Sequence, residues 1–265
     1  MTDIIGPARD WSAVAGAWDA NVEEVDQHTV AATDALFDRL APRPGDRVLE
    51  LAAGPGSLGA AWSRLVGPTG RVLLSDIAPG MVEVAARRNA SLGNVDVAVL
   101  DASAIARADD EFDIVACRMG LMFTPDPPAA LAEIRRVLAP GGRLGALTWA
   151  GIEHNPWMTC VGMAAMMNGL VSGGPPVGPG GIFSLGDPTE LGALAEWAGF
   201  TDVTVDELAV TFRADDIDTH VARVSSLAGP LAAVLEQASP EQSAAYAPTN
   251  TKLLGRICPT VSVRQ

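Results

Sequence analysis

The stretch Arg47–Gly59, RVLELAAGPGSLG, constrains the fold more than any other part of this chain. An apolar run that contains one acidic residue, Glu50, ends in small residues and glycines, which is typical of a buried strand passing into a tight turn. The segment that follows, Ala60–Val66, has helical spacing. Gly54 and Gly56 permit positive φ and a close approach of a ligand, and free N–H groups at the helix start lie beside them. The stretch therefore predicts a strand, a glycine turn and a helix.

The turn also fits the dinucleotide-binding pattern G-x-G-x-x-G over residues 54–59. That pattern is short, so two interpretations stay open: a cofactor site, or a structural turn that binds nothing. A second apolar run, residues 71–76, ends at Asp76, about twenty residues beyond the turn, where a doubly wound fold places a carboxylate on a ribose diol. A carboxylate can accept from both hydroxyls at once.

Strands and helices alternate through the middle of the chain, which predicts an α/β fold with helices on both faces of a doubly wound, mostly parallel sheet. We expect seven strands, the later ones at residues 94–100, 112–116, 143–149, 201–212 and 259–264. Helices are expected at residues 79–89, 126–138, 187–199 and 215–238. Ligands of such sheets bind outside the carboxyl ends of the strands, and that is where the candidate residues fall: Glu50, Gly54, Asp76, Asp101, Cys117 and Arg118.

Helical segments are expected on either side of this sheet. Residues 1–40 would form an N-terminal helical lid with a second helix over 30–40, although ordinary packing on the sheet explains the same pattern. Residues 41–265 would form the sheet domain, with caps at about 150–183 and 213–250. The methionine-rich segment in the first cap suits an irregular apolar ligand, or equally a helix of the core.

Composition excludes several classes of partner. The net charge of −14 argues against nucleic acid and against acidic lipid surfaces. No apolar run is long enough to span a membrane and no basic-then-apolar leader is present, so a cytoplasmic protein is expected. The three cysteines are widely spaced, which predicts buried thiols rather than a metal site or a disulfide framework. The chain is compatible with a homodimer.

Four stretches together resemble the class I S-adenosylmethionine (SAM) dependent methyltransferases. The resemblance is closest to the methyltransferase type 11 group, which includes the menaquinone and ubiquinone C-methyltransferases and many natural-product methyltransferases. The stretches are VLELAAGPGSLG, LLSDIAPGMV, VLDASA and FDIVACRMGLMFTPDPPAALAEIRRVLAPGGRLGALTW. The chain departs from the family at Ala52 and Ala53, where the family usually has Gly followed by Cys or Thr. Because alanine is small, we expect the pocket to survive.

The resemblance implies a Rossmann-like domain that binds SAM at these strand ends. Glu50 would reach the methionine amino group, Gly54 would pass beneath the methionine and ribose, and Asp76 would hold the ribose hydroxyls. Asp101 would accept from the adenine amine, and the N–H of Ala102 would contact the ring. The other residues that the resemblance assigns to the cofactor site are Ala52, Ala53, Ile77, Met81, Cys117, Arg118 and Met119.

The implied reaction is methyl transfer to a small, largely apolar acceptor such as a quinone, polyketide or terpenoid. The side chains expected to bind it are Trp11, Trp18, Met122, Phe123, His154, Trp157 and Met158. His154 is the candidate base, the alternative being a surface histidine in a loop; His28 is a weaker candidate, and His220 is expected to be exposed. Two other functions stay open: a SAM-fold protein that binds SAM without methylating, and an NAD(P)-dependent oxidoreductase, which an acid inside the first strand disfavours.

Overall fold

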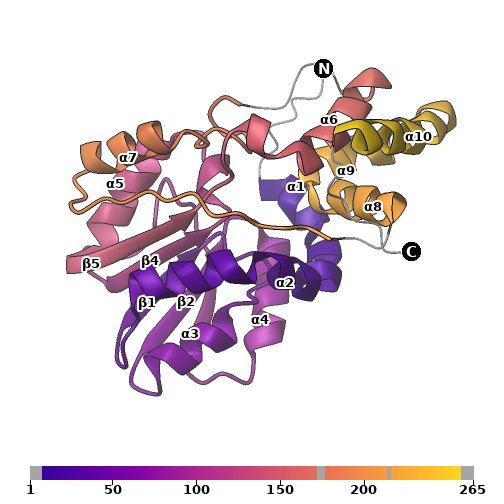
Figure 1. Ribbon diagram of the computed structural model, residues 1–265. Helices are drawn as coiled ribbons and strands as arrows, with labels where there is room; N and C mark the ends of the chain where they lie inside the picture. The colour runs from indigo at the N-terminus through magenta and orange to yellow at the C-terminus, as the bar shows by residue number, and fades with distance from the viewer. Residues whose placement is uncertain (1–7, 172–176, 214–215, 258–265) are drawn as a thin grey trace.

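The computed structural model describes residues 8–171, 177–213 and 216–257, and its centre is a parallel sheet (Figure 1). Five strands pair in the order β3-β2-β1-β4-β5, and every pairing is parallel. The chain order therefore reverses between β1 and β4, which is the switch point of a doubly wound sheet. The strands are β1 (Arg47–Leu51), β2 (Arg71–Asp76), β3 (Val95–Val99), β4 (Phe112–Arg118) and β5 (Leu138–Leu147).

Helices cover both faces of the sheet. One face carries α2 (Ala15–Leu40), α3 (Gly59–Val66) and α4 (Pro79–Asn89), and the other carries α5 (Pro127–Val137) and α7 (Pro188–Trp197). On the first face Trp62 is fully buried, and the ring of Phe37 packs edge-on against it at 4.6 Å between centroids. Such an aromatic contact fixes α2 and α3 to each other as well as to the sheet.

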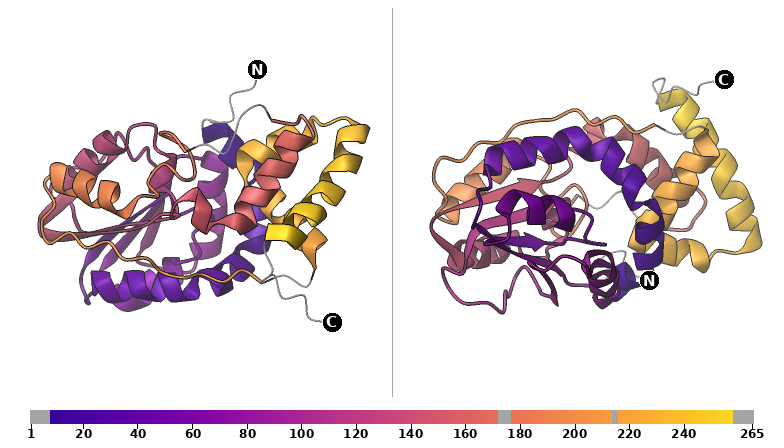
Figure 2. Two further views of the ribbon diagram at one scale, coloured as in Figure 1. Left: turned by 45° about the horizontal axis from the view of Figure 1, so that its top comes forward. Right: turned by 90° about the horizontal axis from the view of Figure 1, so that it is seen from below.

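A group of helices lies beyond the carboxyl ends of the strands, towards which the strand arrows point in Figure 1. It comprises α6 (Pro156–Met167), α8 (Ile217–Leu227), α9 (Gly229–Glu236) and α10 (Pro240–Ile257). Apolar residues of α6, α8 and α10 form a core of their own, and Ser225 and Tyr246 share a buried hydrogen bond of 3.0 Å. The further views in Figure 2 show these helices beside the sheet domain, with α1 (Ala8–Ala13) between them and the sheet.

The predicted elements through residue 149 are confirmed except at the N-terminus and in the bounds of β5, which begins at Leu138 instead of residue 143 and ends at Leu147. The break between the first two helices falls at Val14, not before residue 30, and α2 continues for 26 residues. The polar stretch between residues 23 and 29 contains neither Gly nor Pro, so nothing in it ends a helix. The last helix, α10, was missed because Pro248 lies inside it.

The predicted strand at residues 201–212 is wrong. This segment is extended but pairs with none of the strands in the described part of the chain, and it runs along α2 instead (Figure 1). Arg39 on α2 donates to Thr204 at 2.8 Å and forms an ion pair with Asp206, and the N–H of Arg213 donates to His28 at 2.9 Å. The described residues therefore form five strands, not seven, and the strand expected at residues 259–264 lies outside them.

Candidate cofactor and acceptor site

The turns that follow β1 and β4 meet at the switch point of the sheet. Ala52, just after β1, has a positive φ of 52°, and Gly120 follows the end of β4. A Cβ placed on Gly120 would lie 2.2 Å from the Cβ of Ala52, far closer than two non-bonded carbon atoms can approach. The two turns are in direct contact, and only glycine fits at position 120 while residue 52 carries a methyl group.

Asp76 fixes the glycine turn from the end of β2. Its Oδ2 accepts the N–H of Gly54 at 2.9 Å, and its Oδ1 accepts the N–H of Ala78 at 2.9 Å, just before α4. The residue is only 8% exposed, and burial raises the pKa of its carboxyl above the usual value while these backbone hydrogen bonds oppose the rise. Each carboxylate oxygen has a second lone pair that can accept from a ligand hydroxyl.

The backbone at Gly54 leaves open space beside Asp76. Gly54 has a φ of 55°, and no atom of the surrounding structure lies within 4 Å of the position that a Cβ would take there. An open turn beside a buried carboxylate that is held in place by the backbone can accept the hydroxyls of a nucleoside without rearrangement. The residues present therefore fit the ribose of SAM.

Glu50 lies behind the turn and is 2% exposed. Its Oε2 accepts the indole N–H of Trp62 at 2.9 Å. Burial raises the pKa of Glu50 to about 7, although the charge of Arg118 and the hydrogen bond from Trp62 lower it. Near neutral pH this group is thus divided between its charged and neutral forms, and an ammonium group nearby would favour the charged form.

Arg118 closes the site at the end of β4. Its guanidinium donates to Asp26 of α2 at 2.7 Å and to Ser57 of the glycine turn at 2.9 Å. Cys117 lies just before it and is buried, and burial raises the pKa of its thiol to about 12. A thiol with that pKa stays protonated and is no nucleophile at neutral pH. The arrangement offers binding groups and no covalent catalyst.

The other residues assigned to the cofactor lie in varied surroundings. Ile77 follows Asp76 and is 42% exposed, so its side chain is available to pack against a ring. Asp101 is exposed beyond β3 and accepts the N–H of Ser103 at 2.8 Å.

Other residues assigned to the cofactor are buried. Met81 lies in a cluster with Val14 and other residues of the N-terminal helices, so its side chain contributes to their packing. Ala53 is buried, Ala102 is partly buried against the core, and Met119 has a φ of 58°.

The N-terminal helices cover this edge of the sheet. Trp11 of α1 meets Phe123 of the short helix η1 (Leu121–Phe123) edge-on, with ring centroids 5.0 Å apart. Ser12 accepts the N–H of Gly80 at 3.2 Å, which seats α1 on the start of α4. Farther along, the indole N–H of Trp18 donates to the carbonyl of Leu227 at 3.0 Å. Trp11, Phe123 and Trp18 thus lie between the cofactor residues and the cap.

An aromatic stack joins the cap to the sheet domain. Trp157 of α6 stacks on Phe212 with centroids 4.1 Å apart, and Trp149, beyond the end of β5, packs against Trp157 at 5.3 Å. Met158 packs in the cap core. Met122 is part of η1 and is fully buried, so it contributes to the core of the sheet domain and not to an open surface. The sequence did not predict the contact of Phe212 with Trp157, because the pattern of residues 201–212 predicts a strand of the sheet.

The histidines differ from expectation. His220 is buried, not exposed, because α8 packs on α6. Its Nε2 lies 3.1 Å from the carbonyl oxygen of Trp157. Burial lowers the pKa of His220. His154 lies in the short helix η2 (Ile152–His154), its side chain is 61% exposed, and its neighbour is Glu153 at 3.4 Å. That environment is the one expected of a surface histidine, and His154 stays without a structural role in the site.

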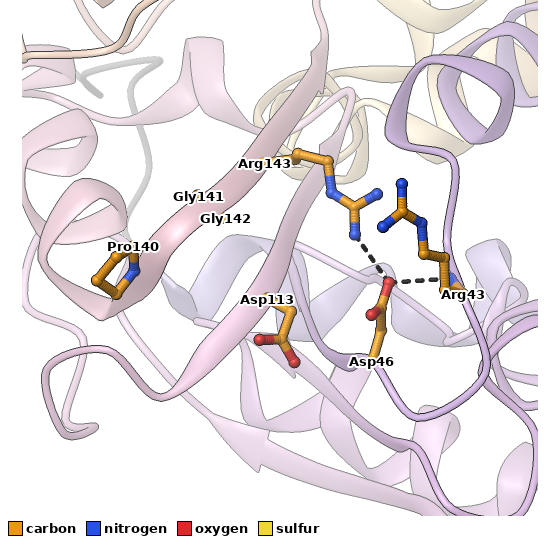
Figure 3. A pocket seen from close by; sticks show the side chains of 7 residues that line it. All are labelled: Arg43, Asp46, Asp113, Pro140, Gly141, Gly142 and Arg143. Atoms are coloured by element: carbon orange, nitrogen blue, oxygen red, sulfur yellow. Dashed lines mark hydrogen bonds and ion pairs between the residues drawn. The ribbon is translucent and has the colours of Figure 1, made fainter.

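The hollow shown in Figure 3 lies at the opposite edge of the sheet. It measures about 250 Å³ and is lined by residues before β1 and at the start of β5, among them Arg43, Asp46 and Arg143. Arg143 and Asp46 are paired at 2.8 Å. Because this is the amino end of the strands, it is not where a doubly wound sheet binds its ligand.

Comparison with known proteins agrees with the geometry. Residues 48–142 match the family described as a methyltransferase domain. The chain is 40% identical over 116 residues to the ubiquinone/menaquinone biosynthesis C-methyltransferase UbiE of Shewanella halifaxensis, and 43% identical over 116 residues to that of Teredinibacter turnerae. These matches cover 43% of this chain and 46% and 47% of the two relatives, so the chain spans less than half the length of either.

Solved structures share the fold. YcgJ from Bacillus subtilis superposes with a TM-score of 0.53 at 22% identity, covering 80% of this chain and 86% of that one. A putative methyltransferase from Bacillus halodurans gives a TM-score of 0.54 at 20% identity, covering 80% and 87%. Among the residues that the structure describes, no helix is long and apolar enough to cross a membrane. Residues 48–142 are therefore similar to methyltransferase domains, and the chain shares the fold of these two solved structures.

Proposed function

We propose that the protein transfers a methyl group from SAM to a small, largely apolar acceptor. The observation that carries the proposal is the carboxylate of Asp76, held by two backbone N–H groups beside the open turn at Gly54. Asp76 would accept from the ribose hydroxyls, Glu50 would face the methionine ammonium, and Ile77 would pack on the adenine. SAM, when bound, supplies an electrophilic methyl group on a sulfonium.

The protein's part in the reaction is to hold the acceptor and exclude water. Direct displacement needs an acceptor atom in line with the S–CH₃ bond. Trp11 and Phe123 meet over the carboxyl edge, and Trp18 ties α2 to the cap, so these side chains would shield the site from solvent. The residues around the site would hold the acceptor atom against the S–CH₃ bond, so that the bond to the acceptor could form as the S–CH₃ bond breaks, with S-adenosylhomocysteine as the leaving group and the acceptor's proton released to solvent.

A quinone-type acceptor has the most support, since the relatives quoted above are named as ubiquinone and menaquinone C-methyltransferases. The aromatic residues around the site fit a flat, apolar ring. Polyketides and terpenoids share that apolar character, so they are also candidate acceptors and are included in the experiment below. The similarity to these relatives covers less than half of this chain, and the family model matches residues 48–142 only, so the cap, which would select the acceptor, has to be tested directly.

The test is transfer of label from methyl-labelled SAM to a panel of acceptors. The panel holds a reduced prenylated naphthoquinone, a reduced benzoquinone, a phenolic polyketide and a terpenoid alcohol, with Asp76→Ala as the matched inactive variant. We expect labelled product and S-adenosylhomocysteine in equal amounts from wild type with one class, and neither from Asp76→Ala. Cofactor binding without a labelled product from any class would favour a protein that binds SAM without methylating.

A further inference from the structure

Arg118 joins three separate parts of the site. From the end of β4 its guanidinium reaches Asp26 in the middle of α2 at 2.7 Å and Ser57 in the glycine turn at 2.9 Å, with a longer contact of 3.4 Å to Thr33. Only 13% of its side chain is exposed. A guanidinium has five N–H donors in a fixed fork, so one side chain can hold several partners in a defined geometry.

The same charge acts on the buried carboxyl of Glu50. Burial is the largest influence and raises the pKa of Glu50 to about 7, Arg118 and the indole of Trp62 lower it, and the negative charge of Asp26 raises it further. The neighbouring thiol of Cys117 is buried and, with a pKa raised to about 12, carries no charge at neutral pH. The opposed charges around Glu50 therefore come from β4, through Arg118, and from α2, through Asp26.

We infer that Arg118 is a positioning residue that ties helix α2 to the glycine turn and places a positive charge that favours the charged form of the buried Glu50 carboxyl. The inference rests on the proposed function, because the charge of Glu50 matters through the ammonium group of SAM. Arg118 would act on the cofactor through Glu50 and not by direct contact, because its guanidinium already donates to Asp26 and Ser57. The seating of α2 and the charge of Glu50 are thereby coupled.

The test measures SAM affinity by calorimetry between pH 6 and 8.5 for wild type and Arg118→Gln. The ratio of the two affinities is the useful quantity, because the titration of SAM itself cancels. Removing the positive charge raises the pKa of Glu50. Starting from a pKa of about 7, a tenfold weaker acid would have an ionised fraction at pH 7 that is about fivefold lower. We expect Arg118→Gln to bind at least about fivefold more weakly at pH 7, and the loss to shrink by pH 8.5.

Two further variants separate charge from packing. Asp26→Asn removes the charge that raises the pKa of Glu50, so its affinity relative to wild type should be greater at pH 6 than at pH 8.5, the opposite trend. Arg118→Lys keeps the charge without the fork and should retain the wild-type pH profile at lower affinity. Arg143→Gln breaks an ion pair at the amino ends of the strands and is the control. It should change neither the affinity for SAM nor its dependence on pH.

A loss that is equal at every pH in Arg118→Gln, or a trend in Asp26→Asn of the same sign, would overturn the inference. Either result would leave the proposed function standing, provided that wild type binds SAM and methylates an acceptor. If wild type binds no SAM at any pH, the proposed function itself fails. Circular dichroism of each variant shows that it is folded, and Asp26→Asn keeps the inference falsifiable if Arg118→Gln does not fold.

Discussion

Substitution of Gly120 by alanine tests the contact at the switch point. The new Cβ would lie 2.2 Å from the Cβ of Ala52 and 3.2 Å from the sulfur of Cys117. Neither partner is the end of a flexible side chain, because Ala52 ends at its Cβ and Cys117 is fixed in β4. The backbone of one turn must therefore move, and overpacking of this kind costs about 1–3 kcal/mol in the free energy of unfolding.

The second change, Ala52→Gly, removes the atom that would be struck. On its own it relieves the positive φ of 52°, a strain of about 1–2 kcal/mol, and adds about 0.5–1 kcal/mol of chain entropy to the unfolded state. These effects oppose each other, so Ala52→Gly alone should shift the free energy of unfolding by about 1 kcal/mol or less. Combined with Gly120→Ala, it should restore most of the lost stability.

The assay is urea unfolding of the four proteins in this double-mutant cycle, without cofactor. We expect a coupling of about 1–3 kcal/mol between positions 52 and 120. Gly93→Ala is the matched control, since no atom lies within 4 Å of its new Cβ, and it should be close to neutral. Gly120→Ala with wild-type stability, or a loss that Ala52→Gly does not repair, would refute the contact.

Three further predictions follow from single residues. The pKa of Glu50 is about 7 in the folded protein and lower in the unfolded chain, so the contribution of its carboxyl to stability is lost as pH rises towards 7. Glu50→Gln should remove this pH dependence. In urea unfolding at pH 8, the variant should be more stable than wild type by up to about 3 kcal/mol. Gly162→Ala, with open space on helix α6, should raise stability by about 0.5–1 kcal/mol, seen as a higher melting temperature. Arg39→Ala breaks an exposed ion pair and should cost less than about 1 kcal/mol, yet hydrogen exchange should quicken around Asp206.

The sheet and the cofactor edge were predictable because their signals are local. Apolar runs that end in glycine or an acid mark buried parallel strands, and the topology rule then places Glu50, Gly54 and Asp76 at one edge. The positive φ of Ala52 is a backbone conformation that glycine adopts more readily than alanine, and the sequence pattern did not reveal it.

The cap was less predictable because its contacts are long-range. The segment at residues 201–212 has the period of a strand, but Arg39 and His28 on α2 hold it away from β5. The sequence predicts an exposed His220, but the packing of α8 on α6 buries it in the structure. Nor could the sequence show that Arg118 is engaged by Asp26, a residue 92 positions away in the chain.

The most direct test of the account is a calorimetric titration of SAM, and then S-adenosylhomocysteine, into wild type and Asp76→Ala. We expect micromolar binding of both to wild type and a loss of at least about tenfold in Asp76→Ala, because charge-assisted hydrogen bonds to a ribose each contribute about 1.5–3 kcal/mol. Equal affinity of the two proteins would contradict the assignment of Asp76. No binding to wild type would contradict the central claim that this edge of the sheet holds SAM.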